Sequence, residues 1–375
     1  MRYILKRLLL MLPTFLGITF LTYLMVSLAP GDFISLKAGL QGELKEGSVN
    51  KEVLDQARKL YVFDNPLLST LDGWEKGMEK TLGLAGAEAP GVMTRLGCRI
   101  AVPAVKFFKI AIGYYEWMKR FLCLDLGKSW KDQRPVKTRI AEALPVTLAL
   151  NLITIALIYL ISIPIGIVSA VRKDSLLDRG TSLILFVLYS LPTFWIGLLL
   201  LMIFSGGEYL NLFPLEGIIS DWAENLGFWG RLVNVLWHLV LPVVTLTYGS
   251  FAFLSRYTRA NMLEVINQQY ITTARAKGLS EKTVIFKHAF RNSLVPLVTL
   301  MATLLPGLLG GSVIVESIFS IPGMGMLAFE AILSRDIPVI MAITSISAIL
   351  TLLGILLADL LYSVVDPRIR LEARI

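Results

Sequence analysis

The chain has 375 residues, of which 55% are hydrophobic and only 17% are charged, and its mean hydropathy is +0.67. A soluble domain carries roughly 25% charged residues, so this composition excludes an entirely soluble protein and indicates one that crosses a membrane several times. The formal net charge of +8 would suit a nucleic-acid-binding protein. The placement of the basic residues argues against nucleic acid as a partner and for a lipid membrane.

Six runs of about 20 mostly apolar residues are each long enough to cross ~30 Å of hydrocarbon. They lie at 8–28, 144–171, 181–205, 237–254, 294–315 and 339–365. The termini and short links on one side of these runs hold sixteen Lys and Arg residues, whereas the links on the other side hold two. Because basic residues are enriched in cytoplasmic links, this asymmetry predicts a multi-pass membrane protein with both termini in the cytoplasm. The first run lacks a small-x-small cleavage site, so we expect a retained span and not a signal peptide.

The long segment after the first run, 29–143, is predicted to be extracytoplasmic. Its stretch 100–124 is apolar, but Arg99, Lys106 and Lys109 interrupt the run, and a further crossing there would invert the placement of every later link. We therefore expect an amphipathic helix that either packs on the external domain or lies at the membrane surface. Cys98 and Cys123 both lie in this segment. They either form a disulfide or remain two separate thiols.

Residues 126–129, Leu-Gly-Lys-Ser, are similar to the end of a phosphate-binding loop. A true loop of this kind needs a glycine five positions before Gly127, where this chain has Leu122, and it needs a preceding strand. We therefore expect no nucleotide site and no catalytic residue in this chain. Any ATP hydrolysis would take place on a partner.

Three residues within the apolar runs are candidates for a pathway or gate. Pro192 lies in the middle of the third run, where it kinks a helix that either lines a pore or merely packs against neighbours. Glu316 ends the fifth run and Asp359 lies in the sixth. Burying a carboxylate in a membrane costs free energy and is usually functional. We therefore expect each of these two residues either to line the pathway or gate, or to make a hydrogen-bonded contact between helices or subunits. His238 has no second ligand at metal-binding spacing, and we expect no metal and no cofactor.

The most sharply patterned polar segment, 270–296, follows the fourth run on the predicted cytoplasmic side. Its small residues Ala274, Ala276 and Gly278 would let a partner's backbone approach closely, and Ser280 is placed to cap a following helix. This pattern predicts a rigid helix-turn-helix. A solvated basic loop on anionic lipid headgroups is the alternative, and the Ala/Gly spacing favours protein docking.

The same segment carries a family resemblance. Tyr-Ile-Thr-Thr-Ala-Arg-Ala-Lys-Gly-Leu at 270–279, followed by His-Ala-Phe-Arg-Asn at 288–292 and by Pro296, closely resembles the EAA loop of ABC importer permeases. The version is that of the first (B-type) membrane subunit of the dipeptide/oligopeptide/nickel family. Further matching segments lie at 6–8, 13–17, 29–32, 191–197, 316–319, 322–325, 335–336 and 359–370. Residues 78–114 match poorly.

The resemblance implies a permease subunit of an ATP-driven, binding-protein-dependent importer, most often of peptides; nickel as cargo gains no support from this chain. The implied partners are a homologous second permease, two cytoplasmic ABC ATPases and an extracytoplasmic substrate-binding protein. Eight residues would form the ATPase-coupling loop: Tyr270, Thr273, Ala274, Arg275, Ala276, Lys277, Gly278 and Leu279. The alternative is a secondary transporter or channel that works without an ATPase, which would need an internal repeat or broken helices meeting at the midplane.

The implied fold is all-α, with six transmembrane helices of the type I ABC importer architecture and a helical extracytoplasmic insertion after the first helix. On this interpretation, 1–29 form the N-terminal end and first helix, and 30–141 form the insertion. Residues 142–365 form the permease core of five helices, with the coupling loop at 255–293. Residues 366–375 form a cytoplasmic tail.

Overall fold

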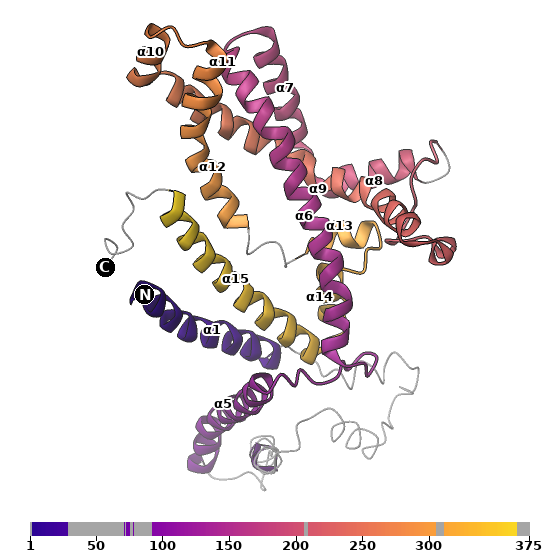
Figure 1. The fold of residues 1–375 in the computed structure, drawn as a ribbon. Helices are drawn as coiled ribbons and strands as arrows, with labels where there is room; N and C mark the ends of the chain where they lie inside the picture. Colours follow the sequence, from indigo (N-terminus) through magenta and orange to yellow (C-terminus); the bar gives the residue numbers. More distant parts are fainter. Residues whose placement is uncertain are drawn as a thin grey trace. The chain divides into compact units, whose positions relative to one another are not determined.

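We analysed a computed structural model, which describes residues 2–28, 71, 73–75, 78, 92–205, 209–304 and 311–365. The regular elements within these ranges are helices, and the strand-like pairing found there is one isolated bridge between Lys128 and Pro135 (Figure 1). The all-α prediction is therefore confirmed for the described residues. Most of the predicted insertion before residue 92, and the tail from 366 onward, lie outside them.

The helices follow one another with short connections after residue 92. In chain order they are α1 (Arg2–Leu28), α5 (Val92–Leu122), α6 (Val136–Val171), α7 (Leu176–Ser190), α8 (Thr193–Phe204), η2 (Asp221–Asn225), α9 (Phe228–Ile266), α10 (Gln269–Ala276), α11 (Glu281–Thr283), η3 (Val284–Phe290), α12 (Arg291–Leu304), α13 (Val313–Ile318), α14 (Met324–Leu333) and α15 (Ile337–Val365).

Four of these helices are long and apolar enough to cross a membrane: α1, α6, α9 and α15. The pair α7 and α8 makes a fifth candidate if its two bent halves count as one span. A multi-pass membrane protein is thus confirmed. The fifth expected run, 294–315, is divided between α12 and α13, with 305–310 outside the described residues, so the count of six spans stays a prediction.

The third expected run is broken at Pro192 and not only kinked there. Leu191 has an extended backbone, Pro192 precedes the first turn of α8, and the axes of α7 and α8 differ by 96°. Proline lacks a backbone N–H and disfavours helical geometry in the residue before it, which explains the break. The Tyr248 hydroxyl donates a hydrogen bond to the Leu191 carbonyl over 2.7 Å, so α9 satisfies a carbonyl left without an intrahelical partner.

The described chain divides into two compact units, each with its own core. The first comprises 1–12, 138–330 and 346–375, and α9 is its central element, packed against α7, α8, α12 and α13. A buried cluster that includes Leu150, Leu241, Val315 and Phe319 joins α6, α9 and α13. This unit holds the candidate coupling segment.

The second unit comprises 13–137 and 331–345. Within it, α5 packs an aromatic face on α1: the rings of Phe121 and Phe15 lie 5.9 Å apart, and the Tyr114 hydroxyl lies 2.9 Å from that of Thr19. The helix predicted at 100–124 is therefore present, and its C-terminal half is packed on a neighbour. Cys123 is exposed and carries a free thiol.

Candidate functional site

The segment predicted to dock a partner is a helix-turn-helix at one end of α9 and α12 (Figure 1). Helix α10 ends at Ala276, and Gly278 turns the chain with φ +77°. Glycine adopts this left-handed conformation without the steric cost that a Cβ brings. A Cβ added there would meet no atom within 4 Å, so the glycine is required for its backbone angle and not for space.

One face of α10 is buried against the same chain. Ile271 is fully buried and Ala274 is 7% exposed, in a cluster with Met262 of α9, Val284 of η3 and Ala170 of α6. The small side chain of Ala274 thus serves close packing inside this chain. This contact fixes the turn to the ends of α6 and α9, as a rigid docking element requires.

The opposite face is open. Seven of the eight predicted coupling residues are exposed, and Ala274 is the exception. Tyr270 and Leu279, near the two ends of this segment, add exposed apolar surface, with 44% and 41% of each residue exposed. The sequence interpretation missed Phe286 on η3, which is 58% exposed. The sequence holds one signal for Phe286: it is an aromatic residue directly after two apolar ones, Val284 and Ile285, which the fold buries.

Two polar contacts brace the turn. The Arg275 guanidinium donates to both carboxylate oxygens of Glu281, over 2.7 and 3.2 Å, and this lowers the pKa of Glu281 and raises that of Arg275. Asn292 at the start of α12 donates to the Tyr270 hydroxyl over 3.0 Å. Ser280 occupies the predicted N-cap position, but its hydroxyl lies 2.9 Å from that of Thr283 and makes no cap bond.

A buried ion pair ties α7 to α9 near the same end. Arg259 donates to both oxygens of Asp178 over 2.8 and 2.7 Å, and Asp178 also accepts from the backbone N–H of Asp174. Asp178 is buried. The partners are 81 residues apart, and no local pattern in the sequence links them.

Glu316 lies in a cage of donors and glycines. It is fully buried and accepts hydrogen bonds from the Thr147 hydroxyl (3.1 Å) and from the backbone N–H groups of Ser312 (3.2 Å) and Met326 (2.8 Å). A Cβ added to the glycines around the carboxylate would come within 2.9 Å of it or closer: Gly311, Gly323 and Gly325. This geometry is that of a satisfied contact, in which Glu316 joins α6, α13 and α14.

The other polar candidates also have partners. Asp359 of α15 forms an ion pair with Arg7 of α1 over 3.0 Å. In the second unit, the buried Ser129 of the Leu-Gly-Lys-Ser stretch donates to Asp336 over 2.5 Å, so this hydroxyl holds two loops together. The described residues contain no group of three or more His, Cys, Asp or Glu side chains that could hold a metal ion.

The described residues thus form several membrane-length helices with a helix-turn-helix anchored at one end. A family model described as "Binding-protein-dependent transport system inner membrane component" matches residues 162–371, and the chain belongs to this family. It is therefore a multi-pass inner-membrane protein of the ABC permease class.

Full-length relatives agree with this assignment. The chain is 35% identical to the "Oligopeptide transport system permease protein AppB" of Bacillus subtilis. This alignment of 368 residues covers 98% of each protein. It is 33% identical to the "Peptidoglycan transport system permease protein YejB" of Agrobacterium fabrum, with 99% of each covered. It is 31% identical to the "Dipeptide transport system permease protein DppB" of Escherichia coli, again with 99% of each covered.

Proposed function

We propose that this chain is the first membrane subunit of an ATP-driven peptide importer. It forms half of the translocation pathway, has six spans in the type I arrangement and keeps both termini in the cytoplasm. Its partners are a second, homologous permease, two cytoplasmic ATPases and an extracytoplasmic binding protein. The full-length similarity to oligopeptide and dipeptide permeases supports peptides as the cargo class. ATP is hydrolysed on the partners, and this chain has no catalytic site.

The observation that carries the coupling role is the two-faced α10. Its buried face, with Ile271 and Ala274, packs against α6, α9 and η3, and its other face is open to a groove on a partner. Because η3 continues directly into α12, a force applied at the turn reaches a membrane helix without a flexible linker. An ATPase shifts the equilibrium between two permease states only if it binds this face more strongly in one state than in the other. The difference between the two binding free energies sets the size of the shift.

Pro192, Glu316 and Asp359 remain candidates for the pathway or gate. Of the three, Pro192 has the geometry that best suits a moving part, because the 96° corner between α7 and α8 lies beside it. Glu316 and Asp359 are each held by partners in this structure, which favours positioning roles within the helix packing.

A pair of matched substitutions tests the coupling proposal. Ala276→Glu places a charge on the open face of α10, whereas Ala260→Glu places the same charge at an exposed alanine of α9. In membranes that contain the complete transporter, we expect Ala276→Glu to abolish ATPase co-purification and peptide uptake and Ala260→Glu to leave both intact. Unchanged co-purification and uptake in Ala276→Glu would exclude docking through this face. Uptake that persists with the ATPases removed would instead support a secondary transporter.

A further inference from the structure

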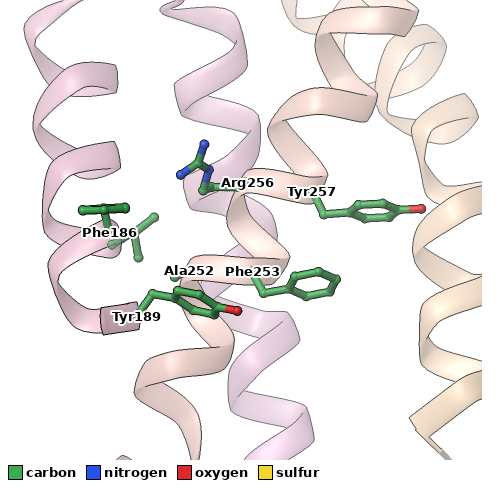
Figure 2. Close-up of a pocket in the computed structure, with 7 residues that line it drawn as sticks. Phe186, Tyr189, Ala252, Phe253, Arg256 and Tyr257 are labelled. Atoms are coloured by element: carbon green, nitrogen blue, oxygen red, sulfur yellow. The ribbon is translucent and has the colours of Figure 1, made fainter. Parts of the chain in front are cut away.

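A cavity of about 370 Å³ lies between α7 and α9, away from the coupling turn. Figure 2 shows side chains that line it, Phe186 and Tyr189 from α7 and four from α9: Ala252, Phe253, Arg256 and Tyr257. Ala252 is buried at its base, whereas Phe186, Tyr189 and Phe253 are more than half exposed. The cavity is therefore an open, aromatic-walled groove on the surface of the helix pair.

The groove is apolar along most of its length and cationic at one end. Arg256 is exposed and contributes the one cationic side chain of the lining. It lies three residues, or ~4.5 Å along the helix axis, before Arg259, which pairs with Asp178 in the first turn of α7. Tyr189 lies near the opposite end of α7. The guanidinium is thus close to the polar boundary of the helix pair, and the aromatic walls extend toward its apolar interior.

The surroundings of Arg256 favour an anion. Positions 172–179 and 256–259 hold five basic and two acidic residues, a formal charge of +3. The basic residues among them are Arg172, Lys173, Arg179, Arg256 and Arg259. One of the two acids, Asp178, is neutralised by its ion pair with Arg259.

We propose that this groove binds one anionic phospholipid of the cytoplasmic leaflet. The headgroup phosphate accepts hydrogen bonds from Arg256, and an acyl chain lies along the apolar and aromatic lining that α7 and α9 contribute. Basic pockets between membrane helices on the cytoplasmic side recognise anionic headgroups in this way. The proposal depends on the predicted orientation of the chain and is independent of the transported cargo.

A peptide is a poorer match for the same groove. A peptide carries an N–H and a C=O group at almost every residue, and each would need a partner when buried. The side chains that line the groove offer one guanidinium and two phenol hydroxyls, those of Tyr189 and Tyr257, and are otherwise apolar. An acyl chain has no polar group to satisfy, so the lining suits a lipid tail.

The test compares two arginine substitutions in the full-length chain. The protein is reconstituted in nanodiscs of phosphatidylcholine with a minor fraction of phosphatidylglycerol, and native mass spectrometry measures the anionic lipid that remains bound. We expect Arg256→Gln to reduce phosphatidylglycerol retention about tenfold, because it removes the hydrogen bonds that a charged side chain donates to the headgroup phosphate. Arg256→Lys should keep most of the retention. Arg172→Gln, which removes the same charge outside the groove, should change it little.

Two results would overturn the proposal. Equal loss in the Arg256→Gln and Arg172→Gln proteins would show diffuse surface charge instead of a site, and unchanged retention in Arg256→Gln would show no headgroup contact. A photoreactive amino acid in place of Phe253 provides a second, structure-independent measurement. Crosslinks to phospholipid support the site, whereas crosslinks to transported peptide during uptake would assign the groove to the translocation pathway.

Discussion

Replacement of Glu316 by Gln tests whether the buried carboxylate holds α6, α13 and α14 together. The substitution keeps the shape but puts an NH₂ donor where the cage already presents donors, from Thr147, Ser312 and Met326. At least one of these groups would then lose its acceptor while buried. Leaving a buried polar group without a partner lowers stability by about 1–3 kcal/mol. The loss lies near the upper end of this range when the missing partner is a charged group.

Glu330→Gln is the matched control. Glu330 is partly exposed, and its ion pair with Arg139 has an N–O distance of 3.6 Å. Partly exposed pairs of this kind contribute about 0–1 kcal/mol. Thermal unfolding of the purified chain should therefore show a clear decrease in apparent Tm for Glu316→Gln and a small one for Glu330→Gln.

A Thr147→Val substitution completes the cycle. Thr147 donates to Glu316 and accepts from the Met324 N–H over 2.8 Å, so its loss disturbs the same cage. The double variant should lose less stability than the two single losses together, because the residues share one network. Equal, small Tm decreases for Glu316→Gln and Glu330→Gln would show that the Glu316 carboxylate does not hold the three helices together. Normal stability with lost uptake in Glu316→Gln would indicate a gating role instead.

Three further predictions concern the coupling end of the molecule. Gly278→Ala should lower stability by roughly 1–2 kcal/mol, because alanine at this left-handed φ is strained, and apparent Tm measures the loss. The Arg275–Glu281 pair should brace the turn at neutral pH. Because the pKa of Glu281 is lowered in the fold, this small contribution is present above the unfolded carboxylate pKa and lost as pH falls through the folded value, which hydrogen exchange of the turn detects. Arg259→Gln removes two charge-assisted hydrogen bonds from the buried Asp178, which keeps the one from the Asp174 N–H, and should cost about 1.5–3 kcal/mol in thermal unfolding.

Controls for these predictions come from the same helices. Gly249→Ala adds a methyl group at a helical position of α9 with no atom within 4 Å, so it should not destabilise the chain, and a loss equal to that of Gly278→Ala would contradict the strain argument. Arg256→Gln removes an exposed charge from α9 and should change apparent Tm little. For the turn, Glu281→Gln should show no change in amide protection factors, corrected for the intrinsic exchange rate, between neutral pH and a pH below the carboxylate pKa.

Periodic and local signals predicted much of this fold. Runs of apolar residues identified the membrane-length helices, and the backbone constraint of Pro192 identified the place where the third run breaks. Gly278 and the small residues around it predicted the helix-turn-helix, since a left-handed turn leaves a local trace in the sequence.

Contacts between distant residues left no such trace. Thr147 and Glu316 are 169 positions apart, so the cage around the carboxylate becomes visible only when α6, α13 and α14 are brought together. Ala274 shows the same limit. Its small side chain suggested an open docking surface, whereas the fold places it against α6 and η3, and the open face belongs to its neighbours along α10.

The proposed coupling role requires an ATPase to contact the open face of α10 and its turn. A photoreactive amino acid at Leu279, which is 41% exposed, measures this contact directly in membranes that contain the complete transporter. We expect a crosslink to an ABC ATPase subunit whose yield changes when ATP is added, and no such crosslink from the same group at Ala260. Crosslinks from Leu279 to lipid alone, in membranes where peptide uptake is active, would contradict it.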